Sequence, residues 1–152
     1  MSTTSREVDV RGPRFAAWVT SAVLVVTLLV SAVSPPAAAV VLGLQAAVFA
    51  VSALRGPRYS PYGLIFAHLI APRLGPVTER EPVAPLKFAQ LVGFVFAVIG
   101  VVGFAVGVTV LGEIATAFAL VAAFLNAAFA ICLGCQLYPL VARLKHAPLT
   151  VR

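Results

Sequence analysis

Long apolar stretches alternate with polar segments along this chain of 152 residues. No charged residue occurs from Phe15 to Leu54, and Glu113 is the only one from Phe88 to Ala142. A helix needs about 20 mostly apolar residues to cross a bilayer, so each stretch is long enough for two crossings. The pattern predicts one membrane domain over residues 1–152, an all-α four-helix bundle with spans at about residues 15–33, 37–54, 86–110 and 114–142.

The polar segment between the second and third expected spans contains a short apolar run. Ser60 is a suitable N-cap for a helix there, Pro61 suits the first helical turn, and Pro72 ends the run. The run, at about residues 61–71, is too short to cross a bilayer. We therefore expect an interfacial or re-entrant helix. Tight turns are expected at Ser34-Pro35-Pro36 and at Gly112-Glu113.

The cationic residues set the expected orientation. Hydrophobic residues make up 61% of the chain and charged residues 11%, against about 25% charged in soluble domains. All eleven Lys and Arg residues precede the first span, lie between the second and third, or follow the fourth. Cytoplasmic loops are the ones enriched in Lys and Arg. We therefore expect a multi-pass protein of the cell membrane with both termini cytoplasmic, and its net charge of +6 does not indicate a nucleic-acid partner.

A string of four residues occurs twice, each time beside an expected span. Arg11-Gly12-Pro13-Arg14 precedes the first span, and Arg55-Gly56-Pro57-Arg58 follows the second. Because two copies of so short a string do not make a structural repeat, we interpret both as helix-stop signals that carry topology charges.

A few residues within the spans predict helix packing rather than chemistry. Gln45 lies mid-span, where a lone amide is expected to hydrogen-bond to another helix. Gly93, Gly100 and Gly107 recur every seven residues, and such a face lets a second helix approach closely. The same face is a candidate contact between two copies of the chain. Glu113 is expected at the outer turn, not as a buried proton carrier.

Both cysteines of the chain, Cys132 and Cys135, lie three residues apart near its end. On a helix this spacing places both thiols on one face, here in the inner leaflet below Arg143. Pro139 lacks an amide hydrogen and clashes with the carbonyl of Cys135, so we expect the helix to be kinked or unwound at the dithiol. The cytoplasm is reducing, so two free thiols are expected at rest, and a structural disulfide would contradict this interpretation.

Three interpretations of the dithiol are open. The leading one is thiol redox or sulfur handling, because a Cys-x-x-Cys setting favours the reactive thiolate. The second is that two small apolar side chains only help the helices to pack. The third is metal binding, which would need two more ligands, and the chain offers His68 and His146. A related hypothesis is that the short helix covers the dithiol and that His68 tunes it. No cofactor-binding motif is present in the sequence, and no cofactor is expected.

Two strings resemble a known bacterial membrane family. They are Phe88-Ala89-Gln90-Leu91-Val92-Gly93 and the more specific Cys132-Leu133-Gly134-Cys135-Gln136-Leu137-Tyr138. The family is the one called domain of unknown function 4395, and the resemblance extends from about Arg11 to Leu144. Its members tend to be encoded near thioredoxin-like proteins and rhodanese-type sulfurtransferases. The resemblance therefore implies, by association, a sulfur or thiol-redox role and a partner of one of these kinds.

The leading hypothesis is a membrane protein of thiol redox or sulfur metabolism that uses Cys132 and Cys135. It would move or transfer a sulfur species with a thioredoxin-like or rhodanese-like partner. One alternative is a non-catalytic membrane subunit or anchor whose cysteines only pack. Another is a small transporter for a sulfur-containing anion, drawn by the basic inner face. The sequence does not distinguish an enzyme from these alternatives.

Overall fold

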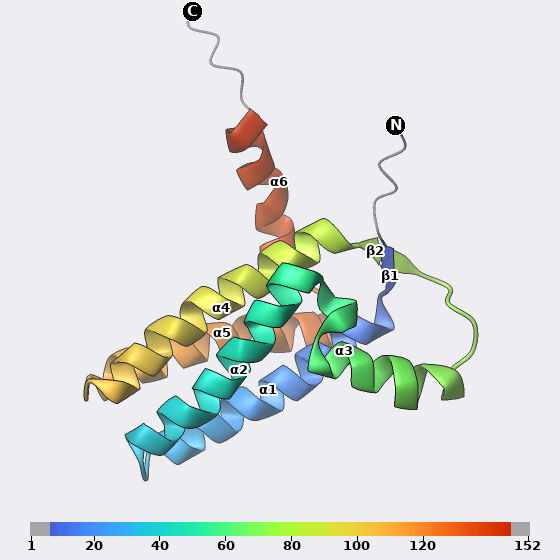
Figure 1. The fold of residues 1–152 in the computed structure, drawn as a ribbon. Coiled ribbons are helices and arrows are strands. Elements are labelled where there is room, and N and C mark those ends of the chain that lie inside the picture. The colour runs from blue at the N-terminus through green and yellow to red at the C-terminus, as the bar shows by residue number, and fades with distance from the viewer. Residues whose placement is uncertain (1–6, 147–152) are drawn as a thin grey trace, which may run out of the picture.

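Four long helices make up most of the computed structural model, which describes residues 7–146 (Figure 1). They are α1 (Arg11–Ser31), α2 (Pro35–Arg55), α4 (Val83–Ala105) and α5 (Thr109–Phe129), and all four are long and apolar enough to cross a membrane. The all-α bundle with four candidate spans is therefore confirmed. The core is small and lies between the helices, where Leu24, Leu42 and Phe104 are fully buried.

The four helices form two antiparallel hairpins that lie side by side. Helix α2 packs against α4, and α1 packs against α5 (Figure 1). The turn between α1 and α2 lies where it was expected, and the Ser34 hydroxyl caps α2 by accepting a hydrogen bond from the Ala37 amide at 3.3 Å.

The turn between α4 and α5 lies earlier in the chain than expected. Gly107, with φ of 84°, is in this turn, whereas Gly112 and Glu113 belong to α5. A Cβ on Gly112 would lie 2.5 Å from the Phe104 ring, so this glycine serves the close packing of α5 on α4 rather than the turn. Glu113 is half-buried near this end of the bundle, where its carboxylate accepts a hydrogen bond from the Ser31 hydroxyl at 3.4 Å.

The expected fourth span, 114–142, is divided into two helices. Helix α5 ends at Phe129, and α6 (Leu133–His146) leaves the bundle in a different direction (Figure 1). Ala130 adopts a left-handed conformation with φ of 56°, which turns the chain. The break therefore precedes the dithiol, and Pro139 lies inside α6 rather than at the break.

The glycine face of α4 is used inside the molecule. A Cβ on Gly93 would lie 2.9 Å from the Phe49 ring, and one on Gly100 would lie 2.5 Å from Leu42, so both glycines face α2. The predicted packing role is thus confirmed for these two. The expected contact between two copies of the chain through this face is wrong, because α2 already covers it and Gly107 lies in the turn.

The long polar segment contains a succession of short helical pieces. They are η1 (Pro57–Tyr59), α3 (Pro61–Ile65), the π-helical η2 (Phe66–Ile70) and η3 (Ala71–Arg73). The expected short helix and its cap are confirmed, since the Ser60 hydroxyl accepts a hydrogen bond from the Gly63 amide at 3.0 Å. The helix lies against α1, where the Phe66 and Phe15 rings are 6.0 Å apart. A small antiparallel ribbon that was not predicted joins β1 (Glu7–Asp9) to β2 (Arg80–Pro82).

Gln45 joins three helices through hydrogen bonds, as its mid-span position predicted. Its Nε2 donates to the Thr20 hydroxyl at 3.4 Å, and its Oε1 accepts from the Tyr62 hydroxyl at 2.6 Å. Burial raises the pKa of Tyr62, so this hydroxyl keeps its proton and stays a donor. The network fastens the short helix α3 to α1 and α2.

Replacing Tyr62 with phenylalanine should destabilise the bundle by about 1–2 kcal/mol, because the buried Gln45 oxygen would lose its partner. The measurement is the free energy of unfolding in detergent micelles titrated with dodecyl sulfate. Tyr59→Phe is the matched control, since Tyr59 is 54% exposed and should tolerate the change. Equal stabilities of the two variants would show that the network contributes nothing.

Replacing Gly103 with alanine should force α4 and α5 apart. A Cβ there would lie 2.6 Å from the backbone nitrogen of Gly112, which cannot move aside as a flexible side chain can. We expect a loss of about 1–3 kcal/mol in the free energy of unfolding, measured in the same titration. Gly43→Ala is the control, because open space surrounds Gly43 and alanine favours the helix. A Gly103→Ala protein as stable as the control would contradict the close approach.

Candidate functional site

The two strings that carry the family resemblance lie against each other in the structure. The Phe88 ring of α4 and the Tyr138 ring of α6 are 6.0 Å apart. Between them the backbones approach so closely that a Cβ on Gly134 would lie 2.5 Å from the Cα of Ala89. Glycine is therefore required at this position, and the start of α6 is held on the polar end of α4.

Cys132 and Cys135 form a disulfide at the start of α6, with their Cα atoms 5.1 Å apart. The expectation of two free thiols at rest is therefore corrected. The bond closes a very short loop, so in the chain-entropy account it stabilises the fold by only about 2 kcal/mol, less than a bond across a longer loop.

The capping of α6 distinguishes the two sulfurs. Cys132 directly precedes the first residue of α6, and its Sγ accepts a hydrogen bond from the Cys135 amide at 3.2 Å. A side chain that accepts from this amide takes the place of an N-cap. The N-terminus of a helix also favours negative charge, so a reduced Cys132 would be stabilised as the thiolate.

A cavity of about 220 Å³ adjoins the disulfide between α1, α4, α5 and the start of α6. Cys132 lines it, together with the amide side chains of Gln90 and Asn126 and the hydroxyl of Thr20. Most of the remaining wall is apolar, and the Phe96 and Phe118 rings, stacked 6.0 Å apart, contribute to it. The arrangement can hold a small molecule beside a reactive sulfur, with a few polar groups to orient it.

The structure does not bring His68 to the dithiol. His68 is exposed on η2, which packs against α1, and it does not line the cavity beside Cys132. The start of α6 packs instead against α4. The structure therefore contradicts the hypothesis that the short helix covers the dithiol and that His68 tunes it.

The other residues considered for a metal site do not gather around the dithiol either. The side chain of His146 lies outside the described part of the chain. Among the residues that the structure does describe, no group of three or more His, Cys, Asp or Glu side chains is placed to hold a metal ion.

Three polar residues of the cavity were not predicted as site residues. Gln90 belongs to one of the two strings of the resemblance, Asn126 lies in the expected fourth span, and Thr20 lies in the first span. An amide within an apolar span is a signal that could have found Asn126, because polar residues inside spans commonly mark function or helix contacts. Only the fold shows that these residues lie beside Cys132.

The fold and the site define the class as a multi-pass membrane protein with a disulfide at the N-terminus of a helix outside its four candidate spans. Residues 8–143 match the family model described as "Domain of unknown function (DUF4395)", so the chain belongs to this family. No curated protein and no solved structure matches the chain. The family named from the sequence is thus confirmed, while its description assigns no activity.

Replacing Gly134 with alanine should displace the start of α6 from α4, because the new Cβ would collide with the Ala89 backbone. After reduction, we expect maleimide to label the two cysteines several-fold faster than in the unchanged protein, where both residues are half-buried. The labelling rate is followed by mass spectrometry. Gly75→Ala is the control, because no atom lies close to a Cβ at Gly75. Unchanged labelling in Gly134→Ala would contradict this packing.

Proposed function

We propose that this protein carries out thiol redox or sulfur transfer through Cys132 and Cys135. The observation that supports the proposal best is a disulfide at a helix N-terminus that adjoins a cavity between the spans. A packing role would use two free cysteines as small apolar side chains, and it requires neither the bond nor the cavity.

Cys132 is the nucleophile of the proposed reaction, and Cys135 is the resolving thiol. In the reduced protein, the Cys132 thiolate attacks one sulfur of a partner's disulfide, which forms a mixed disulfide and releases a partner thiolate. Cys135 then loses its proton and attacks the Cys132 sulfur, so the second partner thiolate leaves. Two electrons have passed to the partner, and the product is the bonded pair seen in the structure.

Sulfur transfer would use the same two steps. The Cys132 thiolate attacks the outer sulfur of a persulfide donor. The rest of the donor leaves as a thiolate, and Cys132 becomes a persulfide. Cys135 then attacks the inner sulfur, releases hydrosulfide and again forms the disulfide. A small sulfur compound fits the cavity of about 220 Å³, where Gln90 and Asn126 can donate hydrogen bonds to it.

We place the dithiol at the cytoplasmic boundary of the cell membrane. The ribbon, the long polar segment and α6 lie at one end of the bundle (Figure 1). The cations of the described chain lie in these segments and in the adjoining ends of α1, α2 and α4. The partner is then a soluble thioredoxin-like or sulfurtransferase protein. Because the cytoplasm keeps thiols reduced, a disulfide on that side is formed and consumed during a reaction cycle.

The two single-serine variants test the proposal with oxidised glutathione as the probe. After reduction and removal of the reductant, Cys135→Ser should gain one glutathione adduct on Cys132, because the resolving thiol is missing. Cys132→Ser should react at least several-fold more slowly, since it lacks the sulfur capped by the helix. The measurement is intact-protein mass before and after dithiothreitol, with the double-serine variant as the blank. Equal rates in the two variants would overturn the assignment of roles, and no adduct on either would overturn the redox function.

A further inference from the structure

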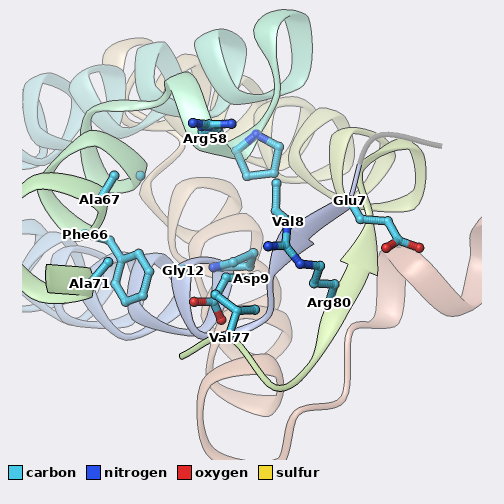
Figure 2. Close-up of a pocket in the computed structure, with 13 residues that line it drawn as sticks. Glu7, Val8, Asp9, Gly12, Arg58, Phe66, Ala67, Ala71, Val77 and Arg80 are labelled. Carbon is cyan, nitrogen blue, oxygen red and sulfur yellow. The ribbon is translucent and has the colours of Figure 1, made fainter. Parts of the chain in front are cut away.

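The two copies of the Arg-Gly-Pro-Arg string meet at the polar end of the bundle. The first begins α1, since Arg11 is its first residue, so this copy is not a helix-stop signal as expected. The second ends α2, as predicted. Gly12 and Pro13 of the first copy line a cavity of about 290 Å³ together with Pro57 and Arg58 of the second (Figure 2).

The arginines of the first copy are used within the fold. Arg11 forms a two-pronged ion pair with Asp9, at 2.8 Å for Nη2, and also donates to the Gly75 carbonyl. Hydrogen bonds from the Arg11 side chain hold the pKa of Asp9 below its usual value, so this carboxylate stays ionised. Its negative charge is balanced by the positive charge of Arg11. Arg14 donates to the Ala127 carbonyl at 3.2 Å.

The arginines of the second copy have no such partner. Among the side chains of residues 7–144, the pair of Asp9 and Arg11 is the one salt bridge that the structure shows, and Arg55 and Arg58 are both exposed. They line a second cavity of about 420 Å³, next to the first, and Lys87 from the first turns of α4 lines it as well. Glu7 is the one carboxylate among the described residues that line it.

The charge balance of this second cavity favours an anion. Three cationic side chains and a single carboxylate line it. The two cavities share part of their lining, and Arg80 adds a further positive charge in the first one. Figure 2 shows the Glu7 carboxylate directed away from the guanidinium groups of Arg58 and Arg80. Arginine binds phosphate with two parallel hydrogen bonds, and Lys adds a mobile point charge.

We infer that the cavity lined by Arg55, Arg58 and Lys87 binds the phosphate of an anionic lipid headgroup. It lies where α2 ends and α4 begins, which is the boundary of the candidate spans. Leu54, next to Arg55, is 78% exposed and gives an acyl chain an apolar surface beside the charged cavity. Basic pockets between membrane helices recognise anionic headgroups in this way.

The test compares two double variants that each remove two positive charges. Arg58→Gln with Lys87→Gln changes the cavity, whereas Arg73→Gln with Arg143→Gln changes exposed cations outside it. Proteins in neutral detergent are titrated with short-chain phosphatidylglycerol, and bound lipid is counted by native mass spectrometry. The cavity variant should bind about tenfold to thirtyfold more weakly than the unchanged protein, and the control variant should change much less. Equal losses in the two variants would overturn the site, because they would show general surface attraction.

Two further arms fix the source of the phosphate and guard against misfolding. Millimolar inorganic phosphate should not displace the lipid, whereas displacement would overturn the assignment to a lipid and indicate a soluble phosphate compound. Arg58→Lys keeps the charge and should retain most of the binding. If Arg58→Lys binds as weakly as the double glutamine variant, although both elute as folded protein, the charge-based inference is overturned.

Discussion

A helix in hydrocarbon must keep its backbone groups hydrogen-bonded, because no water replaces a lost partner there. This constraint decides where the chain can break, and the break between α5 and α6 satisfies it locally. The amide of Ala130 donates to the Asn126 carbonyl, and the amide of Ile131 donates to the Leu125 carbonyl, so these two carbonyls near the end of α5 are occupied. The position of the disulfide depends on this break, since α6 can begin at Leu133 only because α5 has already ended.

The close approach of small residues gives the site its shape. Helices α4 and α5 touch backbone to backbone at Gly103 and Gly112, near their shared turn. At the other end of α4 the start of α6 rests on Ala89, and the cavity beside Cys132 lies between these two contacts. Membrane helices gain little from the hydrophobic effect when they associate, so such glycine contacts and a few buried hydrogen bonds hold them together. The network of Thr20, Gln45 and Tyr62 is the polar counterpart of the glycine contacts.

The polar end of the bundle has two cavities with different linings. The disulfide and its cavity lie where α6 meets α4, and the basic cavity lies where α2 meets the first turns of α4. Helix α4 contributes to both, with Gln90 lining the first and Lys87 the second. A sulfur reaction on this face would thus take place close to the lipid headgroups, and a soluble partner would approach a positively charged surface.

The sequence by itself determined the membrane class, the number of candidate spans and the short helix with its Ser60 cap, because these depend on hydropathy and local capping. It also indicated that Gln45 bonds to another helix, because an amide inside an apolar span needs a partner. It also placed both cysteines in one string, since that is a matter of spacing. Only the tertiary structure decided that α5 ends before the dithiol, that the glycine face of α4 is covered by α2, and that Gln90 and Asn126 lie beside Cys132. The physical reason is that the composition of an apolar run is the same whether it forms one long helix or two helices separated by a break. Contacts between distant segments, such as Gly134 on Ala89, choose between these outcomes.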